Sequence, residues 1–326
     1  MKTDTNTTAA ATQGAGSAQQ GTKKTPLQIF LHWLPFYIMG LPGLVYLFIN
    51  NYIPLAGLQI AFKNFSYSKG MWASSWAGFK NFEFLFASSD AFTIIRNTIL
   101  YNVCWIALGM VLGVAAAILI NEVIGKIKKQ FYMTVILLPY LMSAVIISYL
   151  VFAYLSPTSG LFSKALENMF GKAPAFYQET VWWPFILTFV NQWKGIGFGM
   201  ILYLSSILGI DPSLYEAATL DGATRWQQHR KITIPLLKPM LIMMFILNLG
   251  QIFRSDFGLF YQVPMSQGAL FPVTQTIDTY VYRALLKTNS VAMSSAASFI
   301  QSVVGFIFIV TANKIVSKFD KSSSLF

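Results

Sequence analysis

The side chains of this sequence that could do chemistry are few and scattered. Cys104 is the only cysteine, and His32 and His229 are the only histidines, so neither an intramolecular disulfide nor a histidine metal pair is expected. A phosphate-binding Gly-x-x-x-x-Gly-Lys-Ser/Thr loop, a nucleophile elbow and a His-Glu-x-x-His zinc motif are all missing from the sequence. The residue types therefore predict a non-catalytic chain that binds no cofactor or metal of its own.

A second group of polar residues interrupts long apolar stretches, where polar side chains are costly unless they face protein or water. They are Asn191, Gln192 and Lys194 beside Trp193, and Asn248, Gln251, Arg254 and Asp256 beside Phe253. As a group they predict a polar path for a solute across a membrane. For each residue taken singly, a role in helix–helix packing is the competing interpretation.

The third informative stretch, residues 210–239, is polar and lies between two apolar stretches. Asp211 can cap a helix, and Pro212 suits the first helical turn. The helix should run to about Asp221, and Gly222 then supplies the conformation that ends it. A short, well-delimited helix is therefore expected at the start of this loop.

A second short helix is expected in the same loop. Thr224 followed by Gln227 matches a capping box, and Pro235 should break the helix and open the next apolar stretch. Two short helices joined at a glycine make a rigid loop that can pass a push from a soluble partner into the membrane. Glu216 offers a carboxylate for a basic residue of that partner, and the two alanines after it allow close approach.

The elements that position these residues are predicted from hydropathy. Hydrophobic residues make up 55% of the 326 residues and charged residues 11%, which is too few for the surface of a soluble domain. Six stretches are long enough to cross a bilayer: 35–56, 97–121, 131–155, 184–208, 236–259 and 291–313. We expect an all-α, multi-pass membrane protein with a disordered cytoplasmic tail over 1–25 and a transmembrane domain over 26–326, with the rigid loop at about 210–235.

Glycine spacing and basic residues add two expectations. Gly109 with Gly113, and Gly195 with Gly199, have the Gly-x-x-x-Gly spacing that predicts close helix packing. The net charge of +11 is scattered over short loops, which indicates anionic lipid and topology rather than nucleic acid. The loop 122–130 holds three lysines and predicts that both termini are cytoplasmic.

The segment 62–92 is crowded with aromatic residues and is expected on the outer side. One interpretation is a loop or amphipathic helix lying on the membrane surface. The other is a docking surface for an external partner. Both remain open at the level of sequence.

The rigid loop carries a resemblance to a known family. The run Glu216-Ala217-Ala218, three residues, Gly222, nine residues, Ile232, one residue, Ile234-Pro235 resembles the signature loop of bacterial binding-protein-dependent ABC importer permeases. Ile234 stands where that family usually has leucine. The resemblance covers most of the chain beyond residue 30 and implies a type I importer permease fold. It also implies a role in ATPase coupling for Glu216, Ala217, Ala218, Asp221, Gly222 and Pro235.

A narrower resemblance lies near the N-terminus. Leu41-Pro42-Gly43, Asn51-Tyr52-Ile53-Pro54 and the run from Gln59 to Phe65 resemble the sugar-permease branch that includes LplB-type proteins. Its members import complex oligosaccharides, including alginate and pectin fragments, so the resemblance implies an oligosaccharide, with acidic ones such as alginate or pectin fragments among the candidates. Amides and charges in the polar path would bond its hydroxyls while Trp193 and Phe253 stack on the ring.

The resemblance also implies partners and a location. These are a second, related permease, two cytoplasmic ATPase subunits that hold ATP and Mg, and an extracytoplasmic solute-binding protein, all at the bacterial cytoplasmic (inner) membrane among its lipids. The main rival is an ATP-independent secondary transporter or channel, which the signature loop disfavours. A membrane scaffold is the other rival, and it would not depend on Lys194 or Gln251.

Overall fold

The computed structural model describes residues 26–83, 90–288 and 290–319. The predicted tail over 1–25 lies outside the described residues. The chain divides into two units, residues 1–56 and residues 57–326, and each is described on its own.

The described part of the first unit is one long apolar helix. Helix α1 (Pro26–Leu47) continues through the π-helical turn η1 (Phe48–Tyr52) into the 3₁₀ segment η2 (Ile53–Phe62), which crosses into the second unit. Residues 32–62 are long and apolar enough to span a membrane, in agreement with the predicted first span. Its large side chains are exposed all around the helix, as expected of a segment that is solvated by lipid.

The second unit is also helical, and its described residues contain no β-strand, only an isolated bridge between Lys63 and Trp76. Its longer helices are α4 (Ala91–Glu122), α5 (Lys126–Leu137), α6 (Ala144–Leu155), α7 (Leu161–Phe170), α8 (Trp183–Leu208), α9 (Pro212–Leu220), α11 (Ile234–Leu249), α14 (Ile277–Thr288) and α15 (Val291–Phe319). Its shorter helices are α2 (Gly70–Ala73), η3 (Lys80–Phe82), η4 (Leu138–Leu141), η5 (Thr180–Trp182), α10 (Arg225–Gln228), η6 (His229–Thr233), α12 (Phe257–Gln262), η7 (Gly268–Leu270) and α13 (Phe271–Thr274). The expected all-α class is confirmed.

Across the described residues, five helices are long and apolar enough to cross a membrane, and the number is six if a bent pair of helices counts as one span. The bent pair replaces the continuous span predicted over 131–155: residues 126–141 and 144–155 meet at 97°. Pro139 cannot continue a helix, and Ser143 starts the next one by accepting a hydrogen bond from the Ile146 N–H. The stretch predicted as a span over 131–155 is therefore a bent pair of helices.

The predicted fifth span, 236–259, is also corrected. Helix α11 ends at Leu249, and residues 250–256 form tight turns before α12 begins. The helix ends where it crosses α15, because the Gly250 carbonyl lies against Gly305 so closely that a Cβ at Gly305 would collide with it. Asp256 then caps α12 by accepting a hydrogen bond from the Leu259 N–H at 3.0 Å.

The core of the second unit is the contact between α4 and α8. A Cβ at Gly113 would lie 2.9 Å from the Tyr203 ring, and a Cβ at Gly109 would lie 3.4 Å from Gln192 Oε1. These two glycines therefore let the helices approach, as their spacing predicts. Ala117, Met200 and Leu237 continue the same apolar cluster toward α11.

The glycines of α8 behave differently from the prediction. Gly195 has open space beside it, and Gly199 makes only a distant contact with Tyr203. The close approach occurs at Gly197, where a Cβ would collide with the backbone of Ile136 and Leu137 at the end of α5. The Gly-x-x-x-Gly spacing therefore points to α8, but the glycine of α8 that packs against α5 is Gly197 and not Gly195 or Gly199.

The aromatic segment after η2 is partly a packed structure. Phe62 and Phe82 form a cluster with Phe299 of α15, whereas Trp72 and Phe79 remain exposed. Lys63, which the sequence places among the outer basic residues, is buried and donates from Nζ to the Met71 carbonyl at 2.9 Å. This segment is therefore anchored to α15 and presents only some of its rings.

Candidate functional site

The loop between α8 and α11 has the local structure that its residues predict. Asp211 caps α9 by accepting a hydrogen bond from the Ser213 N–H at 2.9 Å, and this bond lowers the pKa of the carboxyl. Pro212 occupies the first turn. Gly222, at φ +77°, ends the helix, and the Ala223 N–H bonds to the Ala218 carbonyl at 2.9 Å. This closure is a Schellman motif.

The second half of the loop confirms one prediction and corrects another. Thr224 and Gln227 form the expected capping box at the start of α10. Pro235 does not break the helix: residues 225–249 form one apolar helix through the π-helical turn η6. The wider π turn gives room where the proline ring and its missing N–H would otherwise disrupt the ladder.

The outward face of the loop is both charged and apolar. Glu216 and Ala217 are exposed and Ala218 is half-buried, so the alanine surface is open to a partner. Leu220 is 89% exposed and Trp226 69% exposed. Sequence reasoning did not select these two side chains, although large apolar residues in a polar loop are a usable signal of a covered surface.

Side chains tie the loop to the rest of the unit. Tyr215 Oη lies 2.9 Å from Thr233 Oγ1, and Gln228 Nε2 donates to Thr219 Oγ1 at 2.8 Å. Gln228 and Thr233 are buried. Helix α9 is therefore fastened along its length to α10 and η6, which form the base of α11.

A further contact joins the base of α11 to the end of α4. His229 Nε2 lies 3.5 Å from Glu122 Oε1, and Arg225 lies 3.9 Å from the same carboxylate. His229 Nδ1 lies 3.4 Å from Thr233 Oγ1. Only 12% of the His229 side chain is exposed. The sequence alone does not show this contact, because Glu122 lies more than 100 positions earlier in the chain.

The polar residues predicted on α8 take two kinds of position. Gln192 is buried, and its Nε2 donates to the Trp105 carbonyl and to Asn191 Oδ1, both at 3.3 Å. Trp193 is half-buried against the apolar cluster of α6, α8 and α12. Lys194 lies near the middle of α8 and pairs with Asp256 at 3.3 Å. The structure therefore brings Lys194 to the segment after α11.

The polar residues predicted on the fifth span lie where α11 ends. Asn248 and Gln251 are exposed, and Phe253 is half-buried against Ile94 and Ile277. Gln251 and Phe253 follow the helix instead of lying within it. The exposed amides of Asn248 and Gln251 thus flank the start of one irregular segment, residues 250–256, and Asp256 at its end pairs with Lys194 of α8.

That irregular segment is held by amides of neighbouring helices. Asn102 Nδ2 donates to the carbonyls of Ile252 and Arg254 at 3.0 and 2.8 Å, and Gln301 Nε2 donates to the Phe253 carbonyl at 2.8 Å. Backbone without helical hydrogen bonds is stable at membrane depth only where protein satisfies it in this way. Sequence patterns show the polar residues but not which carbonyls they serve.

The described residues hold no cluster of three or more histidine, cysteine or acidic side chains suited to a metal. The arrangement is a folded loop, a partly buried ion pair and exposed amides. None of these is a constellation of nucleophile, base and oxyanion donors. The chemistry that it supports is binding and movement.

Comparison with known proteins places the chain among membrane transport components. Residues 109–321 match the family model described as "Binding-protein-dependent transport system inner membrane component". Protein LplB of Bacillus subtilis is 32% identical over 289 residues, which are 89% of this chain and 90% of that protein. The polygalacturonan/rhamnogalacturonan transport system permease protein YteP of the same organism is 32% identical over 87% of this chain and 88% of its own length.

One solved structure that resembles the chain is that of a bacterial ABC transporter involved in the import of the acidic polysaccharide alginate. The superposition has a TM-score of 0.80 at 30% identity and covers 90% of this chain and 98% of the other. A second structure shows the bacterial alginate ABC transporter in complex with an alginate pentasaccharide-bound periplasmic protein, with the same TM-score and identity.

Proposed function

This chain belongs to the family of binding-protein-dependent transport system inner membrane components, and we propose that it is the permease subunit of an ATP-driven oligosaccharide importer. The observation that carries the proposal is the loop of α9, Gly222 and α10. It is folded, exposed on one side and fastened to α4 and α11 on the other. Such a loop suits the transfer of a mechanical push.

The proposed mechanism separates ATP chemistry from solute movement. The sequence has no phosphate-binding loop, so a partner ATPase subunit holds ATP and Mg. Glu216 and the alanine surface formed by Ala217 and Ala218 enter a cleft of that ATPase, where the carboxylate meets a basic residue. Closure of the two ATPases then pushes α9 and moves the helices between inward-facing and outward-facing states.

The capping residues of the loop have a supporting role in this mechanism. Asp221 and Gly222 end α9, and Pro235 lies two residues beyond the π-helical segment, in the first turn of α11. Together they keep α9 short and fix its direction. A loose loop would absorb the push of an ATPase, whereas this one passes it to Thr233 through Tyr215.

The cargo that fits best is an oligosaccharide, and acidic sugars are included. The support is the cargo of similar proteins, which is polygalacturonan/rhamnogalacturonan for one and alginate for another. The proposed path comprises Asn191, Gln192, Trp193, Lys194, Asn248, Gln251 and Phe253. Among these, Lys194 is a cation that pairs with Asp256, and a carboxylate of an acidic sugar can take the place of Asp256.

The proposed assembly has one copy of this chain, a second related permease, two ATPases inside and a solute-binding protein outside. The similar transporter that was solved with a periplasmic protein supports the last of these. Many large apolar side chains on the spans, including Leu100, Val111 and Phe185, are exposed and require lipid or the second permease. Both termini lie in the cytoplasm.

The test is a charge reversal at the docking surface with a matched control. Glu216→Lys should abolish co-purification of the ATPase from native membranes and stop ATP-driven uptake, because the carboxylate would no longer meet its basic partner. Glu167→Lys, on the exposed face of α7, makes the same charge change away from the loop and should leave both unchanged.

The tagged chain is purified in mild detergent, and mass spectrometry identifies the proteins that co-purify with it. Recovery of an ATPase and a second permease with the wild-type chain and with Glu167→Lys, but not with Glu216→Lys, is the expected result. If the Glu216→Lys chain retains its ATPase and its uptake, the docking proposal is wrong. ATP-independent uptake by the chain alone would instead favour a secondary transporter.

A further inference from the structure

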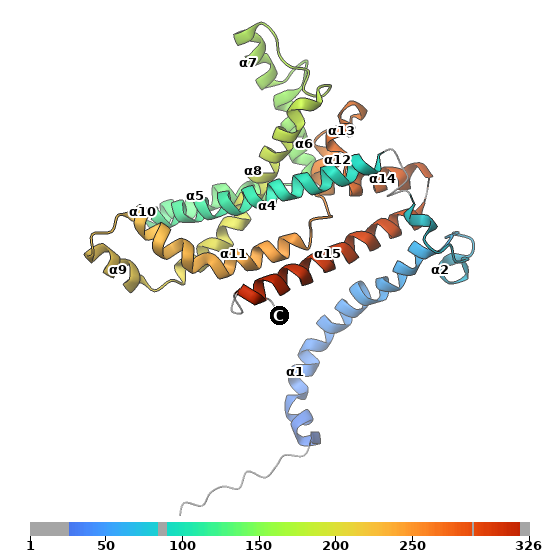
Figure 1. Cartoon of the computed structure of the whole chain (residues 1–326), viewed down its shortest axis with the longest axis horizontal. Helices are drawn as coiled ribbons and strands as arrows, with labels where there is room; N and C mark the ends of the chain where they lie inside the picture. Colours follow the sequence, from blue (N-terminus) through green and yellow to red (C-terminus); the bar gives the residue numbers. More distant parts are fainter. Residues whose placement is uncertain (1–25, 84–89, 289, 320–326) are drawn as a thin grey trace, which may run out of the picture. The chain divides into compact units, whose positions relative to one another are not determined.

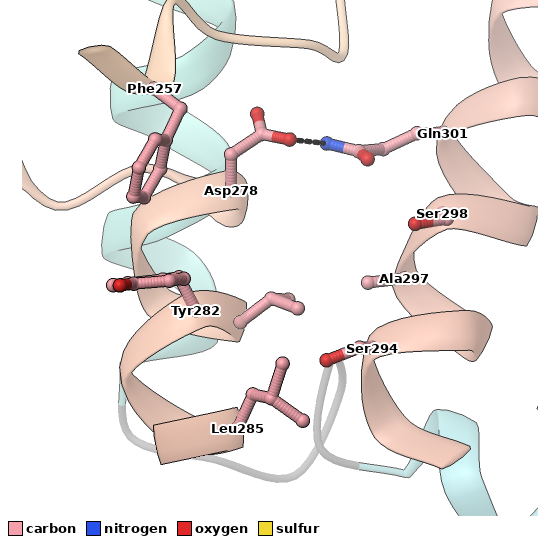
Figure 2. A pocket seen from close by; sticks show the side chains of 9 residues that line it. Phe257, Asp278, Tyr282, Leu285, Ser294, Ala297, Ser298 and Gln301 are labelled. Atoms are coloured by element: carbon pink, nitrogen blue, oxygen red, sulfur yellow. Dashed lines mark hydrogen bonds between the residues drawn. The ribbon is translucent and has the colours of Figure 1, made fainter. Parts of the chain in front are cut away.

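A cavity of about 240 Å³ lies between α14 and α15, outside the polar path described above. Figure 2 shows it as a gap with a polar end and an apolar wall. The residues that give it chemical character are Phe257, Asp278, Tyr282, Ser294, Ser298 and Gln301. Helix α14, which forms one side of the cavity, lies at the end of the second unit away from α9 and α10, as Figure 1 shows.

The polar end is a fixed set of hydrogen-bond acceptors. Asp278 Oδ2 accepts from the Ser255 N–H and hydroxyl, both at 2.7 Å, and Asp278 Oδ1 accepts from Gln301 Nε2 at 3.1 Å. Gln301 Nε2 donates its second hydrogen to the Phe253 carbonyl at 2.8 Å. Both amide hydrogens are thus occupied, and the amide oxygen is left as an acceptor beside the carboxylate (Figure 2).

The α15 side of the cavity carries hydroxyls. Ser294 and Ser298 project toward the gap from successive turns (Figure 2). Ser294 Oγ is buried and has no hydrogen-bond partner among the described residues. A buried hydroxyl without a partner is unfavourable, so the site is incomplete until a polar ligand or water occupies it.

The wall opposite the serines is apolar and includes Val281 and Leu285 of α14, and Phe257 and Tyr282 complete the lining beside it (Figure 2). Phe257 and Tyr282 meet edge to face with ring centroids 4.7 Å apart, and Tyr261 supports Tyr282 at 5.1 Å. Such a packed pair holds its ring orientations, because each ring limits the rotation of the other. The cavity therefore sets a rigid apolar wall against a row of acceptors and hydroxyls.

This combination matches the two sides of a sugar ring. The C–H side of a pyranose is apolar and can lie against Phe257 and Tyr282, while its hydroxyl edge donates to Asp278 and to the Gln301 amide oxygen. The volume is below the usual range for drug-sized ligands and suits one ring instead of a chain.

The charge of the cavity selects among sugars. Asp278 is the only charged side chain among the described residues that line it, so a sugar carboxylate would face another carboxylate at close range. We propose that this cavity binds one uncharged sugar residue of the cargo and discriminates against uronic acid residues. The proposal rests on the oligosaccharide importer function and assigns a second, distinct sugar position within it.

The test uses the complete transporter in lipid nanodiscs, with methyl glycosides of an uncharged hexose, a 6-deoxyhexose and a hexuronic acid as probes. Saturation-transfer NMR and titration calorimetry should show binding of at least one uncharged probe and much weaker binding of the uronate. Ser294→Leu fills the cavity and should lower the affinity for uncharged probes about tenfold or more. The reason is that the variant loses roughly one satisfied hydrogen bond and the space for the sugar ring.

Two further variants keep the proposal falsifiable. Ser295→Leu, the adjacent position on α15 that does not line the cavity, should change the affinity less than about twofold, which separates a helix effect from filling. Asp278→Asn removes the charge and should lower the ratio of the affinity for uncharged probes to the affinity for the uronate about tenfold. This ratio can be read whatever the effect of the substitution on stability.

Equal binding of the uronate, binding that Ser294→Leu leaves intact, or a cavity filled by lipid that no sugar displaces would each overturn the proposal. In those cases ATP-driven uptake of oligosaccharide by the same nanodisc preparation, reconstituted in liposomes, would leave the importer function standing. Loss of ATP-driven uptake by the wild-type complex would instead overturn the importer function itself.

Discussion

Lys194 and Asp256 form the one ion pair between described residues that links the middle of a span to the irregular segment 250–256. The two side chains are 21% and 37% exposed, so the pair is neither a surface contact nor a fully buried one. Its net contribution should lie between the two limits, at about 1–2 kcal/mol. Asp256 has a second role as the cap of α12, which makes the pair a link between α8 and α12.

Lys194→Met should lower the thermal stability of the detergent-solubilised chain by about 1–2 kcal/mol, because it leaves Asp256 partly buried without its cation. Lys194→Met combined with Asp256→Asn should recover most of that loss, since the amide can still cap α12. The measurement is a thermal unfolding series on both variants. Equal stability of the wild type and Lys194→Met would show that the pair contributes nothing.

The same two variants separate stability from transport. If Lys194 contacts the cargo, the double variant regains its fold but not its uptake of an acidic oligosaccharide. If Lys194 serves only to hold α12, uptake returns with stability. The comparison therefore tests the assignment of Lys194 to the proposed path.

At the scale of elements, the contact of α8 with the end of α5 depends on one glycine. A Cβ at Gly197 has no room against Ile136 and Leu137, whereas a Cβ at Gly195 meets open space. Gly197→Ala should therefore destabilise the chain by about 1–3 kcal/mol through overpacking. Gly195→Ala should be neutral or slightly stabilising, because alanine favours the helix.

Thermal unfolding of the two alanine variants in the same detergent checks this prediction. The pair is well matched, since the substitution and the helix are the same and the positions are two residues apart. A loss of stability in Gly195→Ala that equals the loss in Gly197→Ala would contradict the packing described here.

The base of α11 contains a chain of side chains that runs from α9 to α4. It comprises Tyr215, Thr233, His229 and Glu122, with separations of 2.9, 3.4 and 3.5 Å between successive pairs. The π-helical turn η6 holds the two middle members. Wide turns of this kind inside a helix often mark positions of functional strain or movement.

Tyr215→Phe and Glu122→Gln should leave ATPase co-purification intact and lower transport per ATP hydrolysed, because the push on α9 would reach α4 less completely. Substitutions along a coupling network change it by about 0.5–2 kcal/mol, which predicts a several-fold effect. Lys128→Gln, on the exposed face of α5, is the control. The measurement is uptake and ATP hydrolysis in proteoliposomes, and an unchanged ratio in both variants would refute the role of the chain.

At the scale of the whole molecule, the lysine-rich loop 122–130, between the second and third apolar stretches, predicts that this loop is cytoplasmic. Because the number of apolar stretches is even, both termini are then expected on the same cytoplasmic side. In a Cys104→Ser background, Lys126→Cys should react with a membrane-impermeant maleimide only after the membrane is opened. Lys172→Cys, just after α7, should react in intact right-side-out vesicles. The reverse pattern would show that the predicted orientation is inverted.

The sequence predicts the parts of this molecule that local interactions determine. The Asp211 cap, the end of α9 at Gly222 and the Thr224 capping box all depend on residues within a few positions of one another, and all three are confirmed. The bend at Pro139 and the end of α11 at Gly250 were missed because hydropathy stays high through both positions.

Other features could not be predicted, because they join distant segments. His229 meets Glu122 only after the end of α4 comes to the base of α11, and Asp278 meets Gln301 only after α14 folds against α15. The sugar cavity between those helices has no motif in the sequence. The amides of Asn102 and Gln301 show the same limit, since their acceptors are backbone carbonyls of a turn that hydropathy describes as helix.

The exposure of Leu220 and Trp226 on the α9–α10 loop has a consequence for biosynthesis. In a newly inserted copy that has not yet bound its cytoplasmic partner, these apolar side chains are accessible to chaperones and membrane-bound proteases. Such a copy should be short-lived, and its lifetime should lengthen as the supply of the partner rises. Matched production of the subunits would then be enforced by turnover of the unpaired chain, in addition to any control over their synthesis.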